Sequence, residues 1–104
     1  MREAGLSLKP LLSLLLLLNF SSATLLMGIV SNTGSMRPTY YGGEHVMLEP
    51  ADSAEVGDII VFQRDNKLII HRVIFEFEGC YITKGDATFI PDWGCSDPKY
   101  KVVA

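Results

Sequence analysis

Residues 58–84 read DIIVFQRDNKLIIHRVIFEFEGCYITK, three β-rich runs separated by two short turns. Ile, Val and Phe are frequent in these runs, as is typical of strands. The dipeptides Asp65-Asn66 and Glu78-Gly79 lie between the runs and are typical of turns. Because Asp65-Asn66 joins the first two runs over a short distance, they are close enough to form a hairpin. The stretch therefore predicts an all-β domain.

Further β-rich runs flank this stretch, and the chain is long enough for one domain. The expected strands cover residues 44–48, 58–63, 67–77, 80–84 and 99–103. After the apolar N-terminal segment, about 70 of the 104 residues remain, which suits one small domain and leaves no room for a second. The formal net charge is −3 and no Lys/Arg cluster occurs, so the sequence excludes a nucleic-acid partner.

The N-terminal third of the chain is apolar. Residues 11–30 contain no charged side chain, and about 20 such residues form a helix long enough to cross a bilayer. We therefore predict a transmembrane anchor at residues 11–30, preceded by residues 1–10 and followed by a β domain at residues 31–104. A signal peptide cleaved near Ser22-Ala23 and a buried helix of a soluble domain are the alternatives.

The charges on either side of the apolar segment predict its orientation. Arg2 and Lys9 precede it, and the next basic residue is Arg37. Basic residues favour the cytoplasmic side of a membrane. The N-terminus is therefore expected in the cytoplasm and the β domain on the extracytoplasmic or lumenal side, as a single-pass membrane protein.

Cys80 and Cys95 are the two cysteines of the chain. Outside the cytosol an oxidised pair can persist, so a disulfide is one reading and a buried reduced pair is the other. Their spacing, without nearby histidines, does not match a zinc site.

Residues 67–77 alternate in the manner of a half-buried strand. Arg72 and Glu76 fall on one face. The other face carries Ile69, His71, Val73, Phe75 and Phe77. Apolar neighbours favour the neutral imidazole of His71, which can accept a proton. Taken alone, a histidine in this setting is more often a hydrogen-bonded core residue than a catalyst.

Ser35 lies in the segment TGSMRP, which follows the apolar segment directly and so is expected near the bilayer surface. A serine hydroxyl needs a base to become a good nucleophile, and the chain offers His45 and His71. His45 resembles an exposed strand residue, which favours His71. Asp86 and Asp92 are both candidates for the carboxylate that orients the other imidazole nitrogen. Gly85-Asp86 also reads as an ordinary turn.

Four segments resemble, in order, the conserved boxes of the type I signal peptidases. They are Ser35-Met36-x-Pro38, residues 56–62 (VGDIIVF), residues 70–73 (IHRV) and residues 84–86 (KGD). The histidine of the third box resembles the Ser-His branch found in archaea, the endoplasmic reticulum and some Gram-positive bacteria. The resemblance implies a mostly β signal-peptidase-like domain behind one N-terminal transmembrane helix, with no metal and no organic cofactor.

The resemblance also implies roles for individual residues. Ser35 would be the nucleophile, His71 the general base, Asp92 the carboxylate that orients His71, and Asp86 a support of its loop. The backbone N–H of Ser35 and the hydroxyl of Thr33, where relatives more commonly have Ser, would hold the oxyanion. In the segment after the nucleophile, Met36 and Pro38 would contact the substrate. A further departure is Gly43-Glu44, where the family usually has Gly-Asp.

The implied activity is removal of signal peptides from secreted preproteins. Such substrates bind as extended strands with small side chains, typically Ala, at the first and third positions before the cut. The expected partners are signal peptides, the lipid bilayer and the translocation machinery.

Three alternatives remain open. One is a catalytically inactive, membrane-anchored peptide-binding β module, in which Ser35 and His71 would lie too far apart for a hydrogen bond. The second is a secreted all-β binding domain whose leucine-rich segment is removed. The third, a self-cleaving repressor relative with a Ser-Lys pair, is opposed by the apolar segment and by the histidine.

Overall fold

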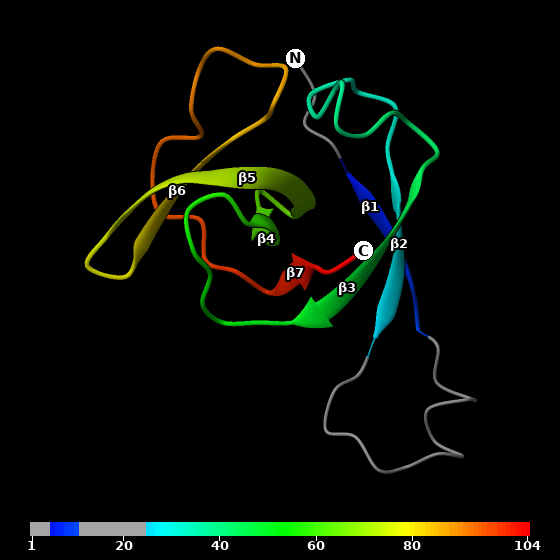
Figure 1. Ribbon diagram of the computed structural model, residues 1–104, viewed down its shortest axis with the longest axis horizontal. Coiled ribbons are helices and arrows are strands. Elements are labelled where there is room, and N and C mark those ends of the chain that lie inside the picture. Colours follow the sequence, from blue (N-terminus) through cyan, green and yellow to red (C-terminus); the bar gives the residue numbers. More distant parts are fainter. Residues whose placement is uncertain (1–4, 11–24) are drawn as a thin grey trace, which may run out of the picture.

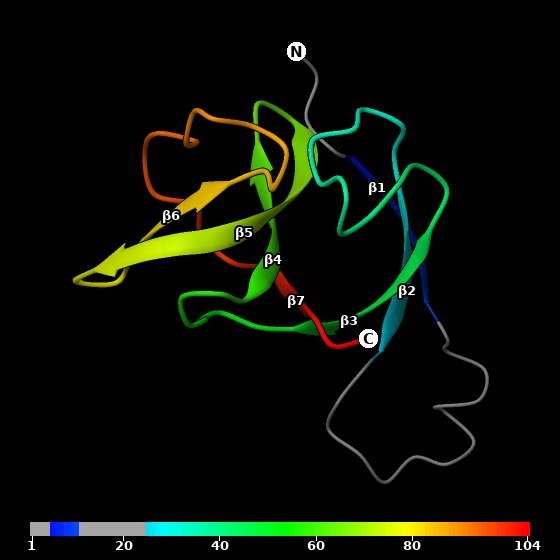
Figure 2. The ribbon, with the colours of Figure 1, turned by 45° about the horizontal axis from the view of Figure 1, so that its top comes forward.

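The computed structural model describes residues 5–10 and 25–104, and its strands form one antiparallel sheet (Figure 1). The strands are β1 (Leu6–Pro10), β2 (Leu26–Val30), β3 (His45–Pro50), β4 (Ile59–Arg64), β5 (Lys67–Phe77), β6 (Cys80–Lys84) and β7 (Tyr100–Val102). Their order in the sheet is β1-β2-β3-β7-β4-β5-β6. The sheet curls strongly, because β1 contacts β5 although four strands lie between them (Figure 2).

The five strands expected from the sequence are confirmed. β5 and β6 have the predicted bounds, and β3, β4 and β7 differ from theirs by one or two residues at their ends. Strands β4 and β5 form the predicted hairpin, with Arg64 paired to Lys67. Asp65 and Asn66 both have positive φ values, 53° and 63°, as a two-residue turn that matches the strand twist requires.

The predicted membrane helix at residues 11–30 is not supported by the described residues. Residues 11–24 lie outside them. Leu26–Val30 form β2, which pairs with β1 on one side and with β3 on the other, so this part of the prediction is wrong. A short apolar run does not distinguish a buried strand from a helix by its periodicity, because neither pattern contains polar breaks. In the described part of the chain, no helix is long and apolar enough to cross a membrane.

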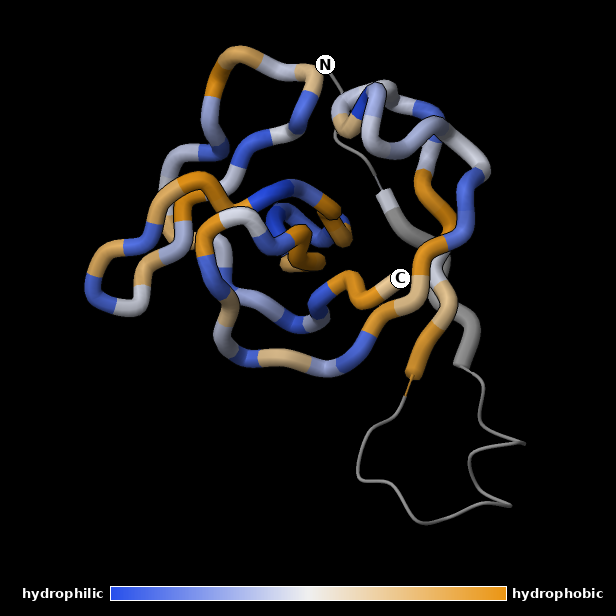
Figure 3. The backbone as a smooth tube through the Cα atoms, viewed as in Figure 1, coloured by the Kyte–Doolittle hydropathy of each residue, from blue (hydrophilic) through white to orange (hydrophobic). Residues whose placement is uncertain are grey.

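The core consists of two apolar clusters that share strands β4 and β5. One contains Val30, Met36, Val46, Leu48, Val61 and Ile70. The other contains Ile60, Phe62, Ile69, Val73 and Tyr81. Successive residues of a strand point to opposite faces, so β4 and β5 contribute to both clusters and are apolar over most of their length (Figure 3). This central hairpin is therefore a rigid base for any side chain that it carries.

The outer end of β5 differs from the expected half-buried strand. Ile69, His71 and Val73 are buried as predicted, but Phe75 and Phe77 are exposed. The pairing of β5 with β6 shifts register between Val73 and Phe75, which interrupts the alternation there. The β5–β6 hairpin also extends beyond the rest of the sheet (Figure 2), so no other strand of the described residues covers its end.

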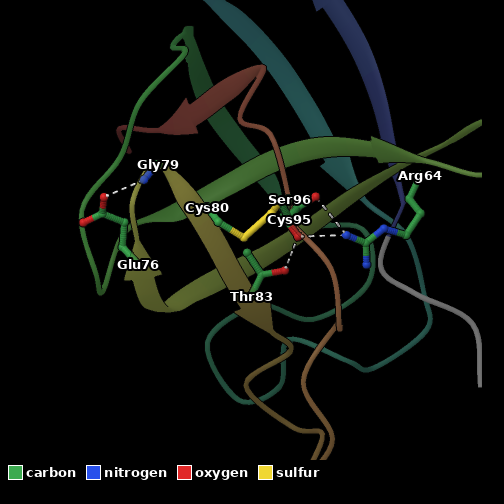
Figure 4. Close-up of a disulfide and its surroundings, with 7 residues drawn as sticks. All are labelled: Arg64, Glu76, Gly79, Cys80, Thr83, Cys95 and Ser96. Atoms are coloured by element: carbon green, nitrogen blue, oxygen red, sulfur yellow. Dashed lines mark hydrogen bonds between the residues drawn. A yellow bond between two sulfur atoms is a disulfide. The ribbon is translucent and has the colours of Figure 1, made fainter.

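Cys80 and Cys95 form a disulfide, which decides between the two readings left open by the sequence (Figure 4). The bond ties the start of β6 to the segment that follows Asp92. Ser96, the next residue, is buried and its backbone N–H donates to the Tyr81 carbonyl, so this segment is held against β6.

We expect removal of the disulfide to destabilise the fold clearly. The bridge closes a loop with a sequence separation of 15 residues, and closing a loop of this length stabilises a fold by about 3 kcal/mol. The double variant Cys80→Ala/Cys95→Ala should therefore melt roughly 12–24 °C lower. Thermal unfolding followed by circular dichroism, with the oxidised parent as control, measures the shift. A change of only one or two degrees would contradict the expectation.

Candidate active site

Ser35 lies in the connection between β2 and β3. The Arg37 N–H donates to the Gly34 carbonyl and the Tyr40 N–H donates to the Met36 carbonyl, so the segment around Ser35 is turned tightly. Met36 is buried in the first apolar cluster and fixes the segment to the sheet. The side chain of Ser35 is itself buried, with 1% of its surface exposed.

His71 lies in the middle of β5, opposite Ile60 of β4. Its ring is 2% exposed and meets the edge of the Phe62 ring, with centroids 6.4 Å apart. Because β5 pairs with a strand on each side, the backbone of His71 has little freedom and the ring is held between the two.

Ser35, His71 and Asp92 form one hydrogen-bonded series. The Ser35 Oγ lies 3.2 Å from His71 Nε2, and His71 Nδ1 lies 2.5 Å from Asp92 Oδ2. These distances are within reach for proton transfer to a general base. A nucleophile, a base and a carboxylate that orients the base are the parts of a serine-hydrolase triad.

The Asp92 carboxylate is held in place by both its backbone and its side chain. Its N–H donates to the Thr83 carbonyl at 2.7 Å, and the Thr83 hydroxyl donates to Asp92 Oδ2 at 2.8 Å. Burial alone would raise the pKa of Asp92, but the hydrogen bond and charge of His71, the Thr83 hydrogen bond and the charge of Arg64 outweigh it. The pKa of Asp92 therefore lies below its usual value, and the group is a carboxylate at neutral pH.

Asp86 has a different partner. Arg72 donates to it twice, from Nε at 2.9 Å and from Nη2 at 2.8 Å, and the Thr39 hydroxyl donates at 2.6 Å. Burial would raise the pKa of Asp86, but the hydrogen bonds from Arg72 and Thr39 lower it more. Arg72 follows His71 on β5, so its side chain points to the other face. Asp86 thus joins the loop after β6 to β5 and to the connection that carries Ser35.

The Thr33 hydroxyl lies beside the Ser35 hydroxyl. It donates to Ser35 Oγ at 3.3 Å and accepts the Ser35 backbone N–H at 3.4 Å. The two donors expected to hold an oxyanion are thus next to each other. Without a bound substrate, the Ser35 N–H is directed to the Thr33 hydroxyl oxygen.

Gly85 packs directly against Ser35 and His71. A Cβ at this position would lie 2.6 Å from the Ser35 carbonyl oxygen and 3.0 Å from His71 Nε2. The N–H of Ala87, two residues further on, donates to the same Ser35 carbonyl at 2.9 Å. Glycine is therefore required here by a close approach of the backbone, a role beyond the turn that the sequence indicated.

Gly85→Ala is expected to lower kcat for a hydrolysis reaction at Ser35 by about 100-fold or more. The new methyl group must push Ser35 and His71 apart, and a displacement of about 1 Å in an active site can cost that much. Steady-state kinetics on the variant measures the loss. Gly79→Ala is the control, because Gly79 has positive φ but no neighbour for a Cβ. Equal effects from both variants would contradict a steric role at the site.

The remaining predicted residues lie elsewhere. Met36 is 1% exposed and packs in the core. Its contact with substrate stays a prediction. Pro38 follows a cis peptide bond and is exposed. His45 begins β3 and is exposed, as expected.

A pocket of about 410 Å³ adjoins His71. The loop after β6 lines it with residues 87–92, in which Phe89 and Ile90 are exposed. The pocket thus lies beside the base and offers apolar surface. The sequence analysis did not assign Phe89 and Ile90 to the site, since two apolar residues in a loop have no distinguishing pattern.

No curated protein and no solved structure matches the chain. A protein-family comparison matches residues 6–75, about two thirds of the chain, to the family described as signal peptidase, peptidase S26. The matched residues include Ser35 and His71. The chain therefore belongs to the S26 signal peptidase family.

Proposed function

We propose that this protein is a serine endopeptidase that removes signal peptides from preproteins, with Ser35 as nucleophile and His71 as general base. The observation that carries the proposal is the 3.2 Å contact between Ser35 Oγ and His71 Nε2, with Asp92 on the other imidazole nitrogen. Membership of the S26 family supports the substrate class. The contact argues against the inactive peptide-binding module, for which a longer distance was expected.

The proposed reaction has two steps. Ser35 Oγ attacks the scissile carbonyl while His71 Nε2 takes its proton, and the tetrahedral intermediate collapses when His71 returns that proton to the leaving amine. A water, deprotonated by His71, then hydrolyses the acyl ester and releases Ser35. Asp92 stabilises the imidazolium in both steps, because its carboxylate faces Nδ1.

The Ser35 N–H and the Thr33 hydroxyl would stabilise the oxyanion. For this, both must turn from each other to the carbonyl oxygen of the substrate. Donors aimed at a developing oxyanion are each worth about 10²–10³ in rate. Their proximity in the free protein, 3.4 Å between Thr33 Oγ1 and the Ser35 nitrogen, supports this role.

Attachment to the membrane is part of the proposal. It rests on the apolar sequence of residues 11–24. Because β1 pairs with β2, Lys9 lies in the same sheet as His71, so the single-pass orientation predicted from Arg2 and Lys9 does not fit the described strands. The proposal keeps the catalytic residues on the extracytoplasmic or lumenal side, where the Cys80–Cys95 disulfide can persist. Preproteins emerging from the translocation machinery would be the substrates.

The test is cleavage of a preprotein with an Ala-x-Ala site by the full-length chain in detergent, with products identified by mass spectrometry. Cleavage after the second small residue, absent in Ser35→Ala and His71→Ala, is the expected result. His45→Ala is a matched control, since it removes an exposed imidazole on β3. A folded parent that cleaves no preprotein would overturn the proposal.

A further inference from the structure

A series of buried polar side chains continues from Asp92 away from Ser35. The Thr83 hydroxyl on β6 contacts Asp92 Oδ2 at 2.8 Å and Ser96 Oγ at 2.9 Å. Arg64, at the end of β4, donates from Nη2 to Ser96 Oγ at 3.2 Å. Figure 4 shows Thr83, Ser96 and Arg64 converging beside the disulfide.

The proton direction along this series is determined by its two ends. A guanidinium has donors only, so Ser96 Oγ accepts from Arg64. Asp92 is a carboxylate and accepts only, so the single Thr83 proton goes to it. Thr83 Oγ1 must then accept from Ser96, which uses the Ser96 proton. Both hydroxyl protons therefore point toward Asp92.

The acceptor-only character of the Asp92 carboxylate also determines which nitrogen of the His71 imidazole carries the proton. Since Asp92 Oδ2 can only accept, Nδ1 of His71 carries a proton, and in the neutral ring Nε2 is then the acceptor that faces Ser35. We propose that Thr83, Ser96 and Arg64 are positioning residues that hold Asp92 ionised and oriented and so keep His71 in the tautomer that can act as a base. The inference rests on the proposed function of Ser35 and His71.

Burial makes these contacts hard to replace by solvent. Thr83 is 0% and Ser96 is 1% exposed, so water has no ready access to the hydroxyl groups. Arg64 is partly buried, lies over the Phe62 ring with 5.2 Å to the centroid, and also donates to the Cys95 carbonyl at 3.3 Å. The disulfide anchors Cys95 to β6 and so keeps Ser96 in register with Thr83.

Two features indicate that these hydrogen bonds do more than give each buried polar group a partner. Both hydroxyl protons of the series point toward one carboxylate, and Thr83 and Arg64 both contribute to the lowered pKa of that carboxylate. A role confined to stability would affect the melting temperature without affecting the state of His71.

The test compares Thr83→Val, which removes the hydroxyl at similar volume, with Thr83→Ser, which keeps it. We expect Thr83→Val to lower kcat about tenfold or more with KM little changed, because a hydrogen bond to a charged group has that worth. Thr83→Ser is expected to recover most of kcat. A kcat of Thr83→Val equal to that of the parent would overturn the proposal.

The tautomer of His71 is the second readout, measured by ¹⁵N NMR of the ring nitrogens in the full-length chain. We expect Nδ1–H in the parent and in Thr83→Ser, and a growing Nε2–H signal in Thr83→Val. An unchanged tautomer in Thr83→Val would overturn the positioning role. This readout needs no substrate, so it tests the series even if the parent cleaves no preprotein, which would count against the proposed function alone.

Arg64→Met extends the test to the other end of the series and covers a failure of Thr83→Val to fold. Arg64 is only partly buried and lies at a strand end, so the replacement should be tolerated. It is expected to lower kcat about tenfold and to increase the Nε2–H signal. Parent-like kcat and tautomer in this variant would remove Arg64 from the proposal.

Discussion

Ser35→Ala and His71→Ala are each expected to lower kcat for preprotein cleavage by roughly 10⁶-fold, and the double variant to lose no more than either single one. In the proposed mechanism the two side chains form one proton-transfer unit, since Ser35 Oγ and His71 Nε2 are hydrogen-bonded at 3.2 Å. Without the base the hydroxyl is a weak nucleophile, and without the hydroxyl the base has no proton to accept. Removing either member therefore removes the function of both.

Single-turnover cleavage by the two single variants and the double variant measures this coupling. Residual cleavage of about 10³–10⁴ over the uncatalysed rate is expected in all three, from oxyanion stabilisation and substrate binding. The His45→Ala control should match the parent. Additive losses, with the double variant much slower than either single one, would contradict a Ser35–His71 unit.

Asp92→Asn is expected to lower kcat by roughly 10⁴-fold with KM little changed. Asp92 Oδ2 accepts from both the Thr83 hydroxyl and His71 Nδ1, so an amide NH₂ in the place of this oxygen would donate to Nδ1, with the Thr83 hydroxyl turned to Ser96. A donor at that place favours the tautomer with the proton on Nε2, which cannot accept the Ser35 proton. The geometry at Ser35 is preserved while the base is disabled.

Steady-state kinetics and ¹⁵N NMR of His71 together check this expectation. The matched control is Asp86→Asn, because Asp86 is the same residue type in the same loop but pairs with Arg72 and Thr39. It should lower stability and leave the tautomer of His71 unchanged. If Asp86→Asn shifted the tautomer and Asp92→Asn did not, the assignment of Asp92 would be wrong.

The β5–β6 region shows which structural features can be predicted from local sequence patterns and which cannot. Residues 67–77 and 80–84 were predicted with their observed bounds, because alternation and the Glu78-Gly79 turn are properties of neighbouring residues. The exposure of Phe75 and Phe77 was not predicted. It depends on a register shift against β6 and on the absence of a covering strand among the described residues. Neither can be predicted from the sequence of residues 67–77 alone.

The sequence alone predicted the β-rich hairpin core. Through its resemblance to the signal peptidase boxes it also predicted Ser35 with His71, Asp92 as the carboxylate that orients His71, and Asp86 as a support of its loop. Only the tertiary structure showed the contacts, Asp92 with His71 and Asp86 with Arg72, because adjacent residues of β5 point to opposite faces and the loop after β6 passes both. It also placed Leu26–Val30 in a strand and brought Arg64, Thr83 and Ser96 together. Those contacts join residues that are distant along the chain, through strand pairing and a disulfide, and no spacing within one segment encodes them.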